Sequence, residues 1–151
     1  MNIERCEDLV ERTRQAHTRL SECMSEAAEQ RGDSLATMLL VYLAQHEQAL
    51  ASTIERITEH ADSRALHARL HDAVPGDMLV LDLDSEAYAQ MSVDELSREI
   101  FAIHNRIIDL YRSLENRPGL DRAGELLAEM LQLEEHETMR LAQQVNRMHE
   151  L

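Results

Sequence analysis

The sequence predicts an all-α protein, a four-helix bundle made of two helical hairpins that a long crossover joins. Ala, Leu, Glu, Arg, Met and Gln dominate its 151 residues, and these residue types are strong helix formers. Glycine occurs four times and proline twice, and runs of the β-branched and aromatic residues typical of strands are nearly absent. A chain of this length is expected to form one domain, residues 1–151, with a core of its own.

Apolar residues recur at spacings of three and four in two stretches that a turn at residues 31–33 separates. The first predicted helix covers residues 3–30, and its apolar seam is Leu9, Thr13, Ala16, Leu20, Cys23 and Ala27. Asp33 or Ser34 is expected to cap the second helix, whose seam is Leu39, Leu43, Leu50, Ile54 and Ile57. That helix either continues past Glu59 or breaks near residues 62–63 into a short extra helix that ends about Asp72.

The second hairpin follows a connection of different character, residues 75–91, which we expect to lie extended on an apolar surface. At about 3.3 Å per residue it can reach from one end of a bundle to the other. Ser92 and Glu95 have the spacing of a capping box, with Met91 and Leu96 as its hydrophobic staple, so the third helix should begin here. Residues 118–119, Pro-Gly, should end it, and a fourth helix should run from Asp121 to about Met148.

The two hairpins resemble each other in sequence. Residues 9–20 align with residues 96–107 at an offset of 87, which pairs His17 with His104. Residues 43–47 align with residues 133–137 at an offset of 90, which pairs His46 with His136. A duplicated helical hairpin joined by a crossover is one known plan for a four-helix bundle.

Charge and composition disfavour several classes of partner. The net charge is −14, and such a chain repels the phosphates of nucleic acids and anionic membrane surfaces. One phenylalanine, three tyrosines and no tryptophan provide no platform for stacking bases. Cys6 and Cys23 are expected about 25 Å apart on one helix, too far for a disulfide. Reduced thiols, a charged N-terminal segment and the lack of a long apolar stretch favour a cytoplasmic location.

Four histidines are expected at one level of the bundle, because residues equally far from a tight turn lie side by side on antiparallel helices. The first pair lies 15 residues before and 14 residues after Gly32, and the second pair lies 15 before and 17 after Gly119. The four are His17, His46, His104 and His136. We expect their imidazoles to form a metal site near the middle of the bundle.

Two glutamates lie close enough to the predicted seams to assist such a site. Glu137 falls on the seam of the fourth helix, and Glu47 flanks the seam of the second. A carboxylate at a core position needs a partner, since an unpaired buried charge is costly. Imidazole nitrogens and carboxylate oxygens together are ligands for iron, manganese, zinc or copper. The alternative is a metal-free polar layer, in which His46, His136, Glu47 and Glu137 pair with one another or with arginines.

The topology and these residues resemble the ferritin-like superfamily, in particular its small rubrerythrin-like members. The family pattern is one glutamate on each of helices 1 and 3, and Glu-x-x-His on each of helices 2 and 4. Carried over, the motif histidines match His46 and His136, whereas the glutamates three residues earlier are replaced by Leu43 and Leu133. At the same height along the bundle, His17 and His104 occupy the places where the family pattern has the glutamates of helices 1 and 3.

This departure from the family pattern implies a single ion or a histidine-rich pair of ions, with iron, manganese or zinc as candidates and no organic cofactor. It gives no ground for a ferroxidase or peroxidase activity, and no residue pattern identifies a small-molecule substrate or a hydrolase. The second hypothesis is a metal-free bundle that acts as an oligomerising or partner-binding module, for instance as a homodimer. Its basis is the loss of both motif carboxylates, together with the apolar crossover around residues 79–83.

Overall fold

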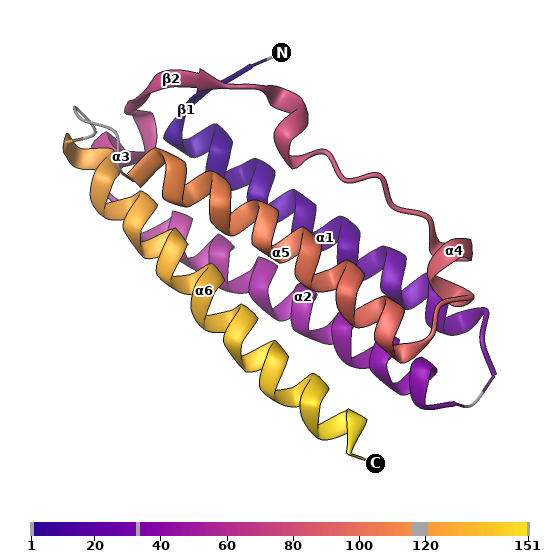
Figure 1. Ribbon diagram of the computed structural model, residues 1–151. Coiled ribbons are helices and arrows are strands. Elements are labelled where there is room, and N and C mark those ends of the chain that lie inside the picture. The colour runs from indigo at the N-terminus through magenta and orange to yellow at the C-terminus, as the bar shows by residue number, and fades with distance from the viewer. Residues whose placement is uncertain (1, 33, 116–120, 151) are drawn as a thin grey trace.

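The computed structural model describes residues 2–32, 34–115 and 121–150, and four long helices dominate it. They form an elongated bundle (Figure 1) and comprise α1 (Cys6–Glu29), α2 (Leu35–His60), α5 (Val93–Glu115) and α6 (Asp121–His149). Helix α1 packs mainly against α2, and α5 packs mainly against α6. The prediction of an all-α bundle built from two hairpins is confirmed.

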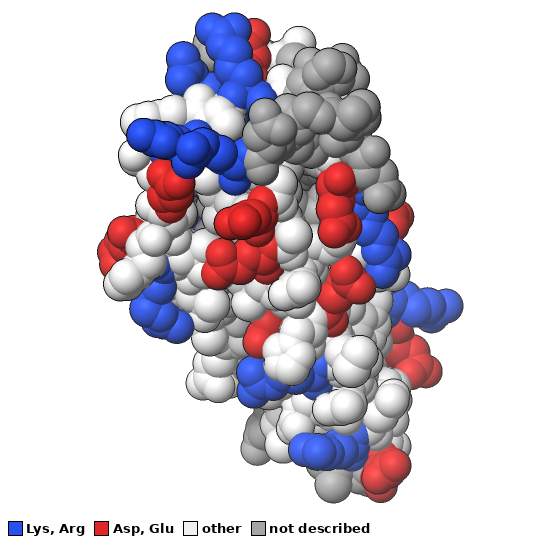
Figure 2. Space-filling model, turned by 90° about the vertical axis from the view of Figure 1, so that its left-hand side faces the viewer, with Lys and Arg blue, Asp and Glu red and all other residues white. Residues whose placement is uncertain are grey.

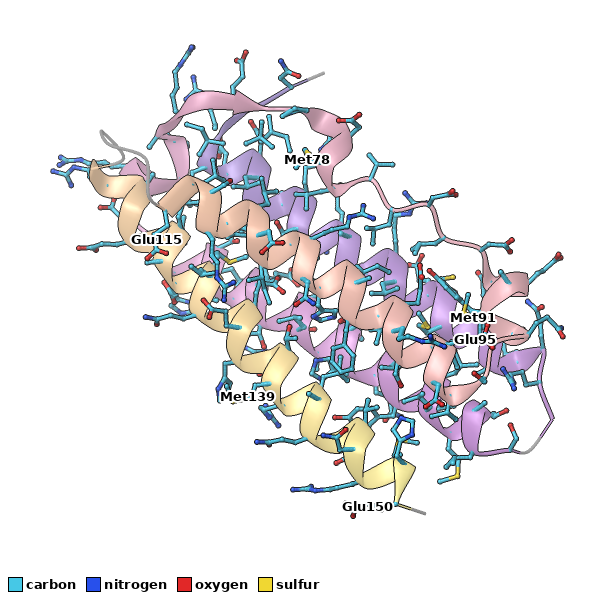
Figure 3. The ribbon with its side chains drawn as sticks, viewed as in Figure 1. Met78, Met91, Glu95, Glu115, Met139 and Glu150 are labelled. Carbon is cyan, nitrogen blue, oxygen red and sulfur yellow. The ribbon has the colours of Figure 1, made fainter. Side chains whose placement is uncertain are left out.

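The crossover between the hairpins runs the length of the bundle (Figure 1). It contains α3 (Ser63–His67), strand β2 (Arg69–Val74), a 3₁₀ turn η1 (Gly76–Leu79) and α4 (Ser85–Ala89). Leu79 and Leu81 are buried, whereas Met78 (Figure 3) and Val80 are about half exposed. The segment therefore lies on an apolar surface as expected, but the 3₁₀ turn and α4 interrupt its extended course.

A short antiparallel strand pair at one end of the bundle was not predicted. Strand β1 (Ile3–Arg5) pairs with β2, so that Ile3 lies opposite Val74 and Arg5 lies opposite Arg69. The first helix consequently begins at Cys6, three residues later than predicted, and the Cys6 N–H donates to the carbonyl of Ala68 at 2.9 Å.

The chain after α2 also differs in part from expectation. The second helix ends at His60 and a break follows at residues 61–62, as one of the two alternatives predicted. The extra helix α3 ends at His67 rather than near Asp72, because the following residues form β2.

Two helix starts match the predicted caps. The Ser34 side chain accepts a hydrogen bond from the Thr37 N–H at 3.2 Å. Ser92 accepts from the Glu95 N–H at 3.1 Å, and the Glu95 carboxylate accepts from the Ser92 N–H at 3.3 Å. The alternative cap, Asp33, and the predicted turn at residues 118–119 lie outside the described residues.

Replacing Ser92 with alanine should lower the free energy of unfolding by about 1 kcal/mol, because the first turn of α5 loses the side chain that accepts from its N–H group. Urea denaturation followed by circular dichroism measures the change. Ser25→Ala, at an exposed position inside α1, is the matched control and should leave stability nearly unchanged. An equal effect of both substitutions would show that the cap contributes nothing.

The surface carries the negative charge of the chain. Figure 2 shows Asp and Glu side chains gathered in the middle of one face, with Lys and Arg side chains spread around them. Within the described residues, no helix is both long enough and apolar enough to cross a bilayer. Polar side chains buried inside the bundle are the feature that calls for a functional explanation.

Candidate metal centre

Four polar side chains meet inside the bundle, one from each long helix. They are His17 from α1, Glu47 from α2, His104 from α5 and Glu134 from α6, and each is 0% exposed. We refer to these four residues as the central quartet. Aliphatic core residues such as Leu20, Leu43 and Ile107 are fully or almost fully buried in the same helices. Two carboxylates and two imidazoles in such an interior must satisfy one another or bind a ligand.

Two short contacts join the hairpins across the quartet. The Nε2 atom of His17 lies 2.7 Å from Oε1 of Glu134, and the Nε2 atom of His104 lies 2.6 Å from Oε1 of Glu47. Each contact links a histidine of one hairpin to a glutamate of the other. The imidazole N–H is the donor where the carboxylate is ionised, and such charge-assisted hydrogen bonds are short.

The remaining nitrogens of the two histidines have different surroundings. His104 Nδ1 lies 3.0 Å from the hydroxyl oxygen of Thr138, a hydrogen bond that fixes the ring orientation. His17 Nδ1 lies 3.3 Å from Oε2 of Glu47, but the angles do not allow a hydrogen bond. The rings of the two histidines have their centroids 5.5 Å apart.

Three buried atoms of the quartet lack a hydrogen-bond partner among the residues that the structure describes. They are Nδ1 of His17, Oε2 of Glu47 and Oε2 of Glu134. Buried polar atoms are rarely left unpaired, and a bound ion or water molecule is a usual explanation where they are. One nitrogen or oxygen from each of His17, Glu47 and His104 can be chosen so that all three atoms lie within 4.8 Å of one another. This buried group is compatible with metal binding.

The donor set fits a transition metal. Neutral imidazole and carboxylate are ligands that zinc, iron and manganese accept, with metal–ligand bonds of about 2.0–2.2 Å for zinc. Donors around a tetrahedral ion of that size lie about 3.3 Å apart. Among His17, Glu47 and His104, the contacts of 2.6 Å and 3.3 Å are close to that spacing, whereas Glu134 contacts the other ring nitrogen of His17.

Without metal, the quartet is strongly polarised. Burial disfavours the charged imidazole of His17, but the carboxylates of Glu134 and Glu47 outweigh it and raise the pKa of His17 to about 10. Burial also disfavours the charged form of Glu47, yet the imidazoles of His104 and His17 hold its pKa far below the ordinary value. The metal-free centre therefore contains ion pairs, and a bound cation would have to displace protons from it.

His46 and Glu137 lie beside the quartet, with side chains that are 8% and 17% exposed. His46 Nε2 is 3.9 Å from Oε2 of Glu137, and its ring centroid is 6.3 Å from that of His104. Burial lowers the pKa of His46, which favours the neutral imidazole. These two predicted residues are thus near the centre without belonging to its innermost group.

His136 does not take part, so the prediction of a fourth central histidine is wrong. Its side chain is exposed on α6, and the buried residue at this level is Glu134. Two residues correspond to about 200° of rotation around a helix, which turns His136 to the outside. Glu134 itself was not among the predicted site residues, and the polar layer that included His136 is excluded in that form.

The error comes from the offset of 90 between the second and fourth helices. An offset of 87, the same as for the first and third helices, pairs Glu47 with Glu134. At this offset buried residues also correspond, as in Leu40 with Leu127, and Leu43 with Met130. The contacts His17–Glu134 and His104–Glu47 are then equivalent in the two halves.

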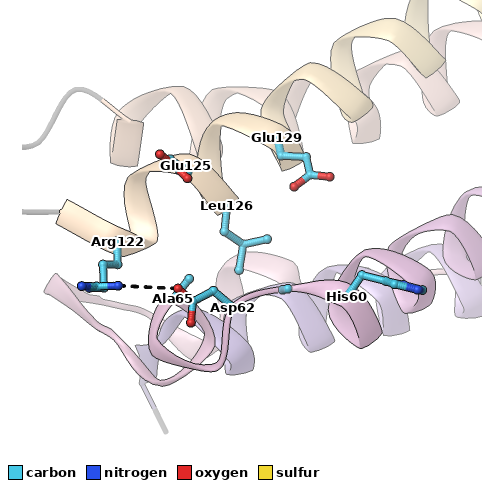
Figure 4. A pocket seen from close by; sticks show the side chains of 8 residues that line it. His60, Asp62, Ala65, Arg122, Glu125, Leu126 and Glu129 are labelled. Atoms are coloured by element: carbon cyan, nitrogen blue, oxygen red, sulfur yellow. Dashed lines mark ion pairs between the residues drawn. The ribbon is translucent and has the colours of Figure 1, made fainter.

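Other groups that could bind a ligand or react lie away from the quartet. A surface pocket of about 320 Å³ (Figure 4) lies between α3 and α6 at one end of the bundle and contains the ion pair of Arg122 with Asp62, 3.7 Å apart. Its charged lining residues are mostly exposed, as on any solvated surface.

Cys6 and Cys23 are buried free thiols, and burial raises the pKa of Cys6 to about 12 and that of Cys23 to about 11. Such thiols are poor nucleophiles and metal ligands.

Comparison with solved structures identifies the fold. The chain is similar to a crystal structure from Thermotoga maritima described as that of a ferritin-like diiron-carboxylate protein, with a TM-score of 0.58 and 13% sequence identity. The match covers 97% of each chain. No model of a known protein family matches the sequence, and no curated protein matches it either. The protein therefore has the ferritin-like fold, as the sequence led us to expect.

The quartet changes how the family pattern applies to this chain. The buried glutamates of α2 and α6 are Glu47 and Glu134, four and one residues after the leucines that the resemblance matched to the motif glutamates. The residues three positions further on are Leu50 and Glu137, so both motif histidines are missing. His17 and His104 stand on α1 and α5, where the pattern has glutamates.

Proposed function

We propose that this protein binds one divalent transition-metal ion in the middle of its bundle, with His17, Glu47, His104 and Glu134 as the ligands. The observation that carries the proposal is the buried group of His17, Glu47 and His104, whose donor atoms lie within 4.8 Å of one another, with Glu134 in contact with His17 and its Oε2 atom lacking a hydrogen-bond partner. Zinc, iron and manganese all accept two nitrogens and two carboxylate oxygens. Iron or manganese would supply one-electron redox chemistry there, whereas zinc would supply Lewis acidity alone.

The residues of the chain would set the properties of such a site. Thr138 holds the His104 ring through Nδ1, which leaves Nε2 directed at the centre. The full burial of the quartet excludes bulk water, and the two carboxylates would balance the charge of a divalent ion. With four protein ligands and no exposed face, the arrangement resembles a closed structural site more than an open catalytic one.

The competing function, a metal-free module that binds a partner, has less support in this fold. It depended on the apolar crossover around residues 79–83 as a contact surface. Leu79 and Leu81 are buried against the protein's own bundle, which leaves Met78 and Val80 as the half-exposed apolar side chains of this segment. Large exposed apolar side chains are few in the described residues and include Met38, Val41 and Met139, which lies on the outer side of α6 (Figure 3). A metal-free charged layer remains the outcome that the following experiment is designed to detect.

The test is a titration of chelator-treated protein with Co²⁺, whose visible absorption reports coordination by nitrogen and oxygen. Wild-type protein should bind one equivalent. Glu134→Gln should weaken binding by more than the roughly 10–100-fold that loss of an outer hydrogen-bond partner costs, because a ligand is lost. Glu135→Gln is the matched control, since the neighbouring carboxylate pairs with Arg112 outside the core, and it should bind normally. Equal affinities of both variants, or no saturable binding by the wild type, would overturn the proposal.

A further inference from the structure

Two polar side chains lie between the central quartet and the surface of the bundle. His46 and Glu137 face each other from α2 and α6, 3.9 Å apart. The Nε2 atom of His46 is buried and lacks a hydrogen-bond partner within the described part of the chain. An unpaired nitrogen on a side chain that is more than nine-tenths buried needs a ligand, at least part of the time.

The internal repeat shows that this polar pair is an addition to one half of the site. At the offset of 87 the counterpart of His46 is Leu133, and the counterpart of Glu137 is Leu50. Equivalent positions around the quartet therefore carry a histidine and a carboxylate in one case and two leucines in the other. Core packing alone accepts leucine at both positions, so the polar pair is not required by the fold.

The polar pair continues outward to solvent and inward to the quartet. Oε1 of Glu137 accepts a hydrogen bond from Arg140 at 3.2 Å, and the side chain of Arg140 is 64% exposed. On the inner side, the His46 ring lies next to His104, with 6.3 Å between the ring centroids. A series of polar groups thus leads from Arg140 through Glu137 and His46 to a ligand of the centre.

We propose that His46 and Glu137 form an uptake site, which binds a divalent cation on its way between solvent and the central quartet. The inference rests on the proposed function, since it requires that the quartet binds metal. A fully buried centre cannot exchange an ion without a partly hydrated intermediate position, because removing all water from a cation in one step is costly. One imidazole and one carboxylate at the edge of the core replace part of that hydration. The net charge of −14 attracts cations to the surface beforehand.

The experiment compares rates and equilibrium binding of Co²⁺ in a double variant that makes both sides of the repeat alike, His46→Leu with Glu137→Leu. Stopped-flow absorption follows loading of chelator-treated protein, and excess EDTA follows release. Both rates should fall by at least about tenfold relative to wild type, while the stoichiometry stays at one ion per chain. Glu135→Leu with His136→Leu is the matched control, because it makes the same chemical changes on the outer side of α6.

Three outcomes would overturn the uptake site. Unchanged rates in the double variant would show that exchange takes another route. Loss of equilibrium binding would show that His46 and Glu137 are ligands of the centre itself. Equal slowing in the control would assign the effect to surface charge. Glu137→Gln alone, which alters a partly exposed side chain, provides a second variant that should slow loading if the double variant does not fold. Failure of the wild type to bind Co²⁺ refutes the proposed function instead, and is seen before any variant is compared.

Discussion

Replacing Glu47 with leucine is expected to lower the free energy of unfolding of the metal-free protein by about 3–5 kcal/mol and to abolish metal binding. Glu47 is the residue that touches both histidines of the quartet, at 2.6 Å from His104 and 3.3 Å from His17. Without it, two fully buried imidazoles remain with one carboxylate, that of Glu134, which contacts His17 at 2.7 Å. Removing one partner from a set of buried charges leaves the remaining charges without compensation. This costs more folding free energy than the ion pair itself contributes.

Urea denaturation in the presence of EDTA measures this loss. Glu55→Leu is the control on the same helix, because Glu55 is exposed and its replacement should change stability by less than about 0.5 kcal/mol. A second variant with leucine at all four quartet positions should recover much of the stability, because no buried charge remains. If Glu47→Leu costs no more than Glu55→Leu, the contacts of the quartet do not stabilise the fold.

The contrast between these variants separates structure from function. A layer that served only to hold the helices in register would be replaceable by leucines without loss of any measurable property except specificity of packing. A metal centre would lose its ion in the same variant even though the bundle became more stable. Neither Glu47→Leu nor the all-leucine variant should therefore bind metal, whereas stability should be low in the first and largely recovered in the second.

The long helices could be predicted because their signals are local. Helix-forming composition, the seams of apolar residues, and the caps at Ser34 and Ser92 all act within a few residues of the chain. The pairing of β1 with β2 could not be predicted in this way, since Ile3 is ordered by Val74, 71 residues away. Three residues that extend a helical pattern locally become a strand because a distant segment supplies their hydrogen bonds.

The sequence predicted the height of the site along the bundle, but not all of the residues that form it. The rule of equal distance from each turn, applied strictly, selects position 47, which lies 15 residues after Gly32, and position 134, which lies 15 after Gly119. These are the glutamates of the quartet, whereas a search for histidines chose His46 and His136, one and two residues away. Successive residues of an α-helix are rotated by about 100° around its axis, so an error of one or two residues changes which side of the helix is assigned to the core. Within the described residues, Glu47 and Glu134 are also the one pair of identical acidic residues at the offset of 87 that is buried in both hairpins.

The fold comparison is informative about the backbone and uninformative about the ligands. At 13% identity the match fixes the arrangement of the helices, and that arrangement places one side chain from each helix at the centre. His17 on α1 and His104 on α5 contribute imidazole nitrogens at that place. A carboxylate can bridge two ions through its two oxygens, whereas an imidazole nitrogen binds one, so the proposed site is better suited to a single ion.

Stability and metal affinity should depend on pH in opposite directions. The pKa of His17 is about 10 in the folded, metal-free protein and about 6.5 in the unfolded chain. The folded state therefore holds this proton more tightly, and the resulting stabilisation is complete below pH 6.5 and is lost as the pH rises towards 10. The pKa of Glu47 is lowered on folding, so its contribution is present above pH 4.5 and is lost as the pH falls. Metal-free protein should thus be most stable between about pH 4.5 and 6.5.

Metal binding must remove the proton from His17, so the apparent affinity should rise about tenfold per pH unit between pH 6.5 and 10. Thermal unfolding at a series of pH values, with EDTA and with excess Zn²⁺, tests both trends in one set of samples. The melting temperature should fall over this range in EDTA, and the gain produced by Zn²⁺ should increase. His17→Gln, which cannot be protonated, should abolish the decline in EDTA. A melting temperature that is independent of pH in the wild type would show that His17 is neutral when folded, and that its contact with Glu134 is not an ion pair.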